Sequence, residues 1–349
     1  MPQLTRTAFA SIVLLACACV HVRHPPPQGP PQVGDRGPRM FPLPGANGEL
    51  HVEALYFDEP GKRIWVPAGS TGNVDVIEIA TGNVQPVTGF QVVEMEEQKG
   101  RPVFGPSSLA RGNGVVFVGN RGSSEVCTID PLTLIRGGCT RVPARPDGLA
   151  YIDTTRELWV INGDSHSITV FDAARPQDLV QTATLPLEGA PLGVAVDQER
   201  HLFYTTLRDK DRTLVIDAAD KKVISSFDTG CGAGGTHGLV LDRERQFAIV
   251  ACDAFVSVLD LPHGGKVVSH EPAGEDLAHL AYVETLHRLF AGSGKNAQLT
   301  EFAVTEDGKL VATRTIPTVH GGKVVVADSK GNAFVADPKG RIIEIESKP

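Results

Sequence analysis

The sequence lacks the short motifs that mark the commonest catalytic and nucleotide-binding sites. It contains no Gly-x-Ser-x-Gly nucleophile elbow, no phosphate-binding loop and no His-Glu-x-x-His metal motif. Its six cysteines form no Cys-x-x-Cys pair, so they favour disulfides over a zinc site. Positive charge is also in deficit, because the sequence has 33 Lys and Arg residues against 41 Asp and Glu residues. This balance argues against a broad nucleic-acid surface, and we expect no nucleic-acid partner.

Long apolar runs are missing as well. Residues 8–16 (AFASIVLLA) follow Arg6 and are too few to cross a bilayer, so residues 1–16 are predicted to be a cleaved signal peptide. What the chain has in abundance is glycine (37 residues) and proline (25 residues). This composition favours many turns over long helices.

Residues 14–17 (LLAC) match the bacterial lipobox, which predicts that Cys17 is lipidated and becomes the mature N-terminus. Ala18 follows it, in place of the acidic residue that signals retention at the inner membrane. We therefore expect a protein of the bacterial cell envelope that reaches the outer membrane or its periplasmic side through a lipid anchor only. A plain secretory signal, giving a secreted or periplasmic protein, is the alternative. Residues 17–38 include the run HPPPQGPPQVGDRGP and are predicted to form an extended tether.

An internal repeat runs through the rest of the chain. A four-residue apolar segment recurs, and the ends of its copies are spaced 52, 42, 45, 45, 41 and 44 residues apart. The copies are WVPA (65–68), FVGN (117–120), WVIN (159–162), YTTL (204–207), IVAC (249–252), FAGS (290–293) and FVAD (334–337). A period of about 40–45 residues with several short strands is typical of β-propeller blades.

Other landmarks keep the same period. A strand closes nine or ten residues before the end of each segment, usually on an acid, and another closes about ten residues after it. The fourth copy illustrates the unit, with predicted strands A (193–196), B (202–206), C (214–217) and D (223–227). Each repeat is therefore predicted to be a four-stranded antiparallel blade.

The segments FVGN, WVIN, VFD, VID and THGLVLD resemble the YVTN-repeat β-propellers, which are relatives of the WD40-like and lactonase-like propellers. The resemblance covers residues 39–349 and implies an all-β, seven-bladed propeller. It implies no single function, because propellers of this kind serve many roles.

The ring is predicted to close through the N-terminal strand. The seventh repeat, residues 323–346, ends before a fourth strand. Residues 39–44 (RMFPLP) resemble the ends of strand D in other repeats, such as ATLPL at 183–187. We expect this segment to complete the last blade and leave no open gap in the ring.

Four cysteines lie within the repeats. Cys127 falls on strand C of the second blade and Cys139 near the start of its strand D, so a turn between them would place the two side chains opposite each other. Cys231 precedes strand A of the fifth blade and Cys252 ends its strand B, where a bridge would pin the glycine-rich loop 230–235. Both pairs are disulfide candidates, and buried free thiols are the alternative for the first pair.

In such propellers the D–A and B–C connections converge on one face, around the central channel, where binding sites usually lie. The candidates that map to D–A connections are His51, Asp147, His237, His279 and His320. His237 and His279 share one position on adjacent blades and are candidate ligands of a divalent metal. The competing interpretation is that a histidine at this position only starts strand A. The B–C loops add Arg121, His166, Arg208, Asp253 and Lys295 to the same face.

Three functions fit these features. We favour a monomeric, non-enzymatic scaffold that binds an envelope protein or a small polar ligand through its central funnel. The alternative is a metal-dependent, lactonase-like hydrolase, for which the resemblance implies oxygen ligands, and Asn120, Asp147, Asn162 and Asp253 would supply them. A redox or copper-linked role of the histidines ranks last. A divalent metal is the only cofactor that the sequence suggests.

Overall fold

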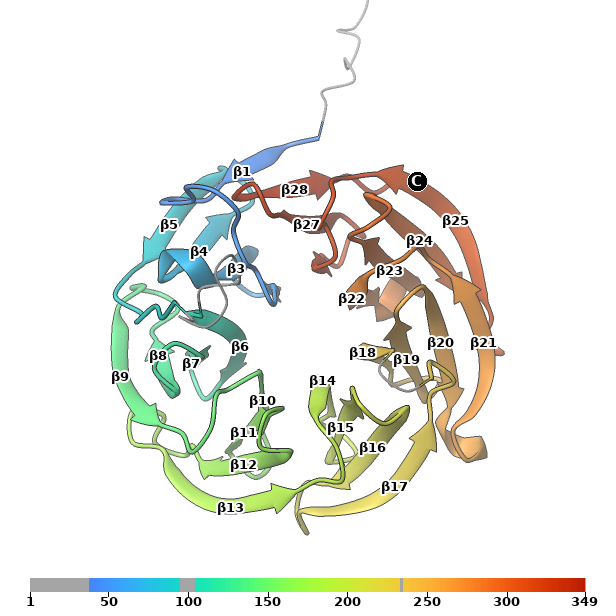
Figure 1. The fold of residues 1–349 in the computed structure, drawn as a ribbon, viewed down its shortest axis with the longest axis horizontal. Helices are drawn as coiled ribbons and strands as arrows, with labels where there is room; N and C mark the ends of the chain where they lie inside the picture. The colour runs from blue at the N-terminus through green and yellow to red at the C-terminus, as the bar shows by residue number, and fades with distance from the viewer. Residues whose placement is uncertain (1–37, 95–103, 233–234, 349) are drawn as a thin grey trace, which may run out of the picture. The chain divides into compact units, whose positions relative to one another are not determined.

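The computed structural model of the chain describes residues 38–94, 104–232 and 235–348. The predicted signal peptide and lipidated Cys17, with all of the tether but its last residue, lie outside the described residues. The described chain forms seven four-stranded antiparallel sheets arranged in a ring around a central channel (Figure 1). This confirms the predicted all-β, seven-bladed propeller. None of its helical turns, which are three residues long, has the length or apolarity to cross a membrane.

The strands of blades 1 to 3 are, in chain order, β2 (Tyr56–Asp58), β3 (Arg63–Ala68), β4 (Asn73–Glu78) and β5 (Asn83–Val87); β6 (Pro106–Gly112), β7 (Val115–Asn120), β8 (Glu125–Ile129) and β9 (Arg136–Arg141); β10 (Gly148–Ile152), β11 (Glu157–Asn162), β12 (Ser167–Asp172) and β13 (Val180–Pro186). Those of blades 4 to 6 are β14 (Pro191–Asp197), β15 (Leu202–Leu207), β16 (Arg212–Asp217) and β17 (Lys222–Asp228); β18 (Thr236–Asp242), β19 (Phe247–Cys252), β20 (Phe255–Asp260) and β21 (Lys266–Pro272); β22 (Leu277–Val283), β23 (Arg288–Ser293), β24 (Gln298–Val304) and β25 (Leu310–Pro317). Blade 7 contains β26 (Val325–Ala327), β27 (Ala333–Asp337), β28 (Arg341–Ile345) and β1 (Met40–Pro42). The short 3-10 turns are η1 (Gly69–Thr71), η2 (Leu261–His263) and η3 (Glu284–Leu286).

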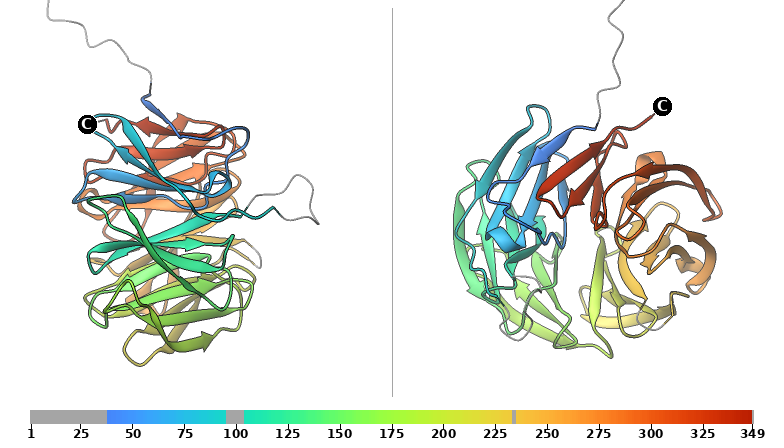
Figure 2. Two further views of the ribbon diagram at one scale, coloured as in Figure 1. Left: turned by 90° about the vertical axis from the view of Figure 1, so that its left-hand side faces the viewer. Right: turned by 45° about the horizontal axis from the view of Figure 1, so that its top comes forward.

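Within each blade the strands follow the order A, B, C, D from the channel to the rim (Figure 1). The D–A and B–C connections therefore share one face, which we call the DA/BC face. The A–B and C–D turns share the opposite face, which we call the AB/CD face. Figure 2 shows the ring from its edge, with the two faces on opposite sides.

The repeated apolar segment forms strand B and lies in the middle of the hydrophobic core. Trp65, Phe117, Trp159, Phe290 and Phe334 at these positions are all buried. The core divides into seven clusters, each joining two adjacent blades. Strand B is buried on both faces because a neighbouring blade covers each side of it, which explains why its apolar residues do not alternate with polar ones.

The periodic acids hold the turns that follow their strands. Asp197 ends β14, and its Oδ1 accepts the backbone N–H groups of Glu199 and Arg200 at 3.1 and 3.0 Å. Asp242 ends β18 and accepts the N–H of Arg245 at 2.9 Å in the same way. An aspartate side chain that bonds the backbone two or three residues on stabilises a tight turn. These acids therefore recur because the blades that carry them make the same kind of turn.

The N-terminal strand closes the ring, as predicted. Strand β1 pairs with β28, with Met40 opposite Ile343 and Pro42 opposite Arg341. Phe41 is 2% exposed and packs with the core cluster between blades 7 and 1. Arg39 adds an ion pair to Glu344, with 3.0 Å between Nη1 and Oε2.

Both predicted disulfides are present. Cys127 and Cys139 face each other across β8 and β9, where their Cα atoms are 4.0 Å apart. Cys231 and Cys252 are also bonded, with a Cα separation of 5.2 Å, and join the D–A connection of blade 5 to the end of its strand B. A disulfide across a glycine-rich connection removes conformational freedom from the unfolded chain.

Candidate functional site

Two of the candidate residues, Arg121 and Asp147, belong to a chain of ion pairs on the DA/BC side of the channel. Arg121 follows β7, and its Nη2 lies 2.7 Å from Oδ1 of Asp147 on the next blade. Its Nη1 lies 3.4 Å from Oε1 of Glu53, which comes from the connection into blade 1. Its guanidinium also stacks on Phe104, with 5.0 Å from Cζ to the ring centre. Arg121 therefore joins blades 1, 2 and 3 at the channel.

The carboxyl of Asp147 is largely buried at this point, since its side chain is 10% exposed. Its Oδ2 accepts the backbone N–H of Gly163 at 2.6 Å. Burial raises the pKa of Asp147 above its usual range, although the Arg121 guanidinium opposes this shift. Asp147 is thus fixed at both oxygens, by Gly163 within its own blade and by Arg121 from the preceding blade.

His237 and His279 lie in strand A of adjacent blades, but the prediction that they share one position is wrong by one residue, because Thr236 and Leu277 both pair with the last residue of strand B and so align His237 with Ala278. Each lies at an irregularity in strand A, between Thr236 and Leu239 in β18 and between Leu277 and Leu280 in β22. Bulges of this kind redirect side chains near the end of a sheet.

The two histidines differ in their surroundings. His237 Nε2 lies 2.7 Å from Oδ1 of Asp253, which was also a candidate. Burial lowers the pKa of His279, and the charges of His237 and Lys323 lower it further while Glu53 opposes them. The ring of His279 is therefore neutral at pH 7.

Glu53 is a residue of this site that the sequence did not single out. It is the common neighbour of Arg121 and His279 and so connects candidates from blades 2 and 6. The reason lies in blade 1, whose strand A, β2, has only three residues. The segment before it makes a single bridge, between Val52 and Ala68, and Glu53 leaves the sheet. Strand β2 is shorter than β14 or β18, and this difference was the one feature that could have pointed to Glu53.

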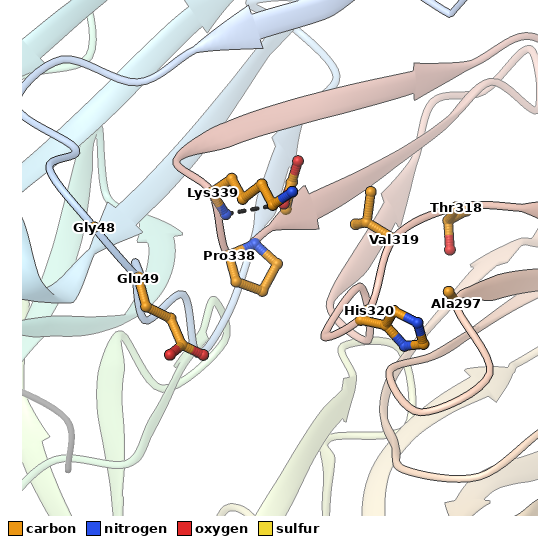
Figure 3. Close-up of a pocket in the computed structure, with 9 residues that line it drawn as sticks. Gly48, Glu49, Ala297, Thr318, Val319, His320, Pro338 and Lys339 are labelled. Carbon is orange, nitrogen blue, oxygen red and sulfur yellow. Dashed lines mark hydrogen bonds between the residues drawn. The ribbon is translucent and has the colours of Figure 1, made fainter. Parts of the chain in front are cut away.

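A groove lies on the DA/BC face where blades 6, 7 and 1 meet. It has a volume of about 760 Å³, and His320 is the predicted candidate that lines it. Figure 3 shows Glu49 and Pro338 on one side of the groove and Thr318, Val319 and His320 on the other. The backbone N–H of Lys339 donates to Asp337 at 2.9 Å and fixes the turn that forms its floor.

A second, smaller hollow adjoins this groove on the channel side. It has a volume of about 200 Å³ and shares Glu49 and Pro338 with the larger groove. His51 lines it together with the ion pair of Lys323 and Asp276, whose Nζ and Oδ1 lie 2.7 Å apart. His320 and His51 thus belong to connected hollows near blade 7, while His237 lies further round the ring on blade 5.

The remaining candidates stand apart at the rim of the DA/BC face. His166 is exposed and occupies a turn with a positive φ of 47°. Arg208 is exposed too, and its backbone N–H donates to Ala190 at 2.9 Å. Lys295 pairs with Glu275. The structure places all three on the expected face without joining them to one another.

The residues suggested as metal ligands do not form one compact set. Among the described residues, one group of three His, Cys, Asp or Glu side chains has its ligand atoms within 4.8 Å of one another, and it consists of Glu125 and the bonded Cys127 and Cys139. No such group contains His51, His237, His279 or His320. Metal binding by His237 and His279 stays a prediction.

The two asparagines proposed as oxygen ligands form hydrogen bonds within their own blades. Oδ1 of Asn120 accepts the N–H of Gly122 at 3.0 Å. Nδ2 of Asn162 donates to Val160 and to Thr169, at 3.2 and 3.0 Å. Both side chains are buried and hold the end of strand B, which explains why the repeat carries asparagine there.

No protein-family model matches the sequence, and no curated protein matches it either. Solved propeller structures share its fold. A chain of the mitotic checkpoint complex has a TM-score of 0.72 at 14% identity, with coverage of 95% of this chain and 100% of that chain. The WD40 repeats of RRP9 have a TM-score of 0.68 at 14% identity (88% and 97% covered), and virginiamycin B lyase from Staphylococcus aureus has 0.66 at 8% identity (88% and 98% covered). At these identities the likeness is one of fold, and the fold is that of a WD40-like, seven-bladed propeller.

Proposed function

We propose that this protein is an envelope-anchored binding scaffold whose DA/BC face holds a polar, extended segment of a partner protein. The observation that carries the proposal is the groove between blades 6, 7 and 1. Its volume of about 760 Å³ lies within the range of natural ligand sites. Its rim offers an acid, a base and an imidazole, namely Glu49, Lys339 and His320.

These three side chains differ from most charges on the same face. Lys323 is paired with Asp276, and Lys295 with Glu275. Glu49, Lys339 and His320, in contrast, make no ion pair with any residue that the structure describes. Charged groups that have no internal partner keep their capacity to bind a ligand. A peptide segment with charges of both signs would satisfy them.

The apolar part of the groove suits a peptide as well. Val319, Pro338 and Ala297 also line the groove and offer contact for aliphatic side chains. Polar groups that fix orientation around an apolar floor are the usual composition of a binding site. The fold itself is shared with the mitotic checkpoint complex, a protein assembly, and this likeness is consistent with a protein partner.

Site-specific photo-cross-linking tests the proposal. A photoreactive residue placed at Thr318 in the full chain, expressed in the source bacterium, is expected to form a discrete adduct with one envelope protein. The same residue at Leu132, which is 86% exposed on the AB/CD face, serves as the control and is expected to give no such adduct. Combining Glu49→Gln with Lys339→Met should reduce the yield at Thr318 several-fold. Equal adducts at both sites, or none at Thr318, would overturn the proposal.

The lactonase-like hydrolase is the alternative that the same protein preparation tests. If the purified chain hydrolyses a lactone in the presence of Ca²⁺ or Zn²⁺, and loses this activity after chelation, the hydrolase function would replace the scaffold function. Asp147→Asn should then lower the rate, because Asp147 is the less exposed of the two carboxylates among the proposed oxygen ligands. The scaffold predicts no metal-dependent turnover and an adduct at Thr318 that survives chelation.

A further inference from the structure

The exposed apolar side chains of the propeller are concentrated on one face. Leu132 and Ile135 lie in the C–D turn of blade 2 and are 86% and 67% exposed. Val180 begins β13 in blade 3, and Val223 and Ile224 lie at the start of β17 in blade 4. Strand D starts at the C–D turn, so all five side chains lie at the AB/CD face of three consecutive blades.

Blade 6 continues the pattern. Leu286 lies in its A–B turn, and Val311 follows the first residue of its strand D. Eight large apolar side chains are exposed among the described residues. The last of them is Met40, which pairs with Ile343 in the middle of β28 in blade 7. The DA/BC face therefore contributes none of the eight. Single apolar residues are normal on a protein surface, and these seven are spread over four blades, but their shared side of the ring is the observation on which the inference below rests.

The chain also reaches the propeller from this face. Strand β1 is the strand D of blade 7 and runs from the AB/CD side towards the DA/BC side. The carbonyl of Arg39, just before β1, accepts the N–H of Glu344 near the end of β28. Arg39, which leads into β1, therefore lies at the AB/CD side of the propeller. A lipid at Cys17, at the far end of the predicted tether, would draw this face towards the bilayer.

We infer that the AB/CD face is a membrane-contacting surface, which rests its exposed valine, leucine and isoleucine side chains on the lipid while the DA/BC groove points away. This inference rests on the proposed envelope anchoring. The turns of this face carry charges of both signs, so the contact depends on the apolar side chains rather than on lipid charge. Each side chain contributes little alone, but a tether raises the effective concentration of lipid at the face.

The orientation also serves the proposed function. A partner segment must reach Glu49 and Lys339 from the solvent side, and a propeller that rested on its DA/BC face would cover the groove. With the AB/CD face on the lipid, the groove opens into the compartment, one ring thickness above the membrane.

The test separates orientation from lipidation. The chain from residue 18 onward, with an N-terminal hexahistidine tag, is bound to phosphatidylcholine vesicles that contain a nickel-chelating lipid. An environment-sensitive fluorescent residue is placed at Leu132, at Ile224 or, as the control on the opposite face, at Arg208. We expect blue-shifted emission and quenching by doxyl-labelled lipid at Leu132 and Ile224, and neither at Arg208. The inference would be overturned if the residues at all three positions gave the same emission and quenching, or if those at Leu132 and Ile224 gave no response.

A second variant tests the apolar contact itself. Leu132→Ser combined with Ile224→Ser changes only exposed side chains, so the fold is preserved. A fluorescent residue at Val180 in this variant should lose its lipid quenching several-fold, and unchanged quenching would refute the apolar contact. Because these vesicles replace the acyl anchor, failure here is distinct from failure of the proposed function, which would appear as an unacylated Cys17 by intact mass or as no adduct at Thr318.

Discussion

Replacing Asp75 with threonine should make the propeller more stable at neutral pH. Asp75 lies in the middle of β4 with no exposed surface, and neither carboxyl oxygen has a hydrogen-bond partner among the described residues. Burial raises its pKa from 3.8 to about 7. An ionised carboxylate that is buried without a partner is costly, so the folded state holds the proton that the unfolded chain releases.

The other blades show what this position accommodates. Asp75 stands opposite Val66, the second residue of the repeated apolar segment. At the same position blade 5 has Ser257 and blade 6 has Thr300. Ser257 donates to the carbonyl of Thr229 at 2.6 Å, and Thr300 donates to another backbone carbonyl in the same way. A hydroxyl donor suits this site, whereas a carboxylate has nothing to donate.

The size of the effect follows from the pKa. A shift of about 3 pH units at about 1.4 kcal/mol each gives an upper bound of about 4 kcal/mol in the free energy of unfolding. Because the folded pKa is raised, the wild type is most stable below pH 3.8 and loses stability as the pH rises towards 7. The variant has no such loss. Its advantage should therefore grow by about 2 kcal/mol between pH 5 and pH 7 and level off above about pH 8.

Denaturant unfolding at pH 5 and pH 8, with both disulfides intact, measures this difference. Asp75→Asn is the matched control, since it has the same shape and no charge. It should lose the pH dependence while gaining less stability than Asp75→Thr, because its amide stays buried. The reasoning is refuted if the gain of Asp75→Thr is equal at the two pH values, or if this variant is the less stable one at pH 8.

Three further predictions concern the ring, a disulfide and the anchor. Phe41→Ala should lower the unfolding free energy by about 3–5 kcal/mol, because Phe41 is 2% exposed where the ring closes, and a melting curve unchanged from wild type would contradict this. Cys127→Ser combined with Cys139→Ser should cost about 3 kcal/mol in urea unfolding, and reduction should then affect the variant less than the wild type. Cys17→Ser should move the protein from the membrane fraction to the soluble periplasmic fraction, and retention in the membrane would argue for another anchor.

Much of the fold was predictable because each blade solves the same physical problem. Strand B is covered on both sides, so it reads as an apolar segment, and its copies reveal the period. Asp197 and Asp242 recur because each holds the same turn. The disulfide partners were predictable because Cys127 and Cys139 share one hairpin, so the spacing along the chain fixes their spacing in space.

The candidate site was less predictable for a reason that is equally physical. The repeat determines the position of a residue along its strand, but it does not determine which residues of other blades that residue contacts across the channel. Glu53 contacts Arg121 and neighbours His279 because a short β2 lets the chain leave the sheet. The groove lined by Glu49 and Lys339 forms from four connections at the junction of blades 6, 7 and 1, and no pattern within one repeat encodes it.

The pairing of β1 with β28 also sets the order in which the molecule can fold. Met40 is among the first residues of the body to emerge during synthesis or export, and its partner Ile343 is among the last. The first strand must therefore wait, unpaired, until almost the whole chain has followed it. Contacts between such distant residues carry a large loop-closure cost and slow folding. An incomplete chain would leave blade 7 without its outer strand, exposing a sheet edge that invites aggregation.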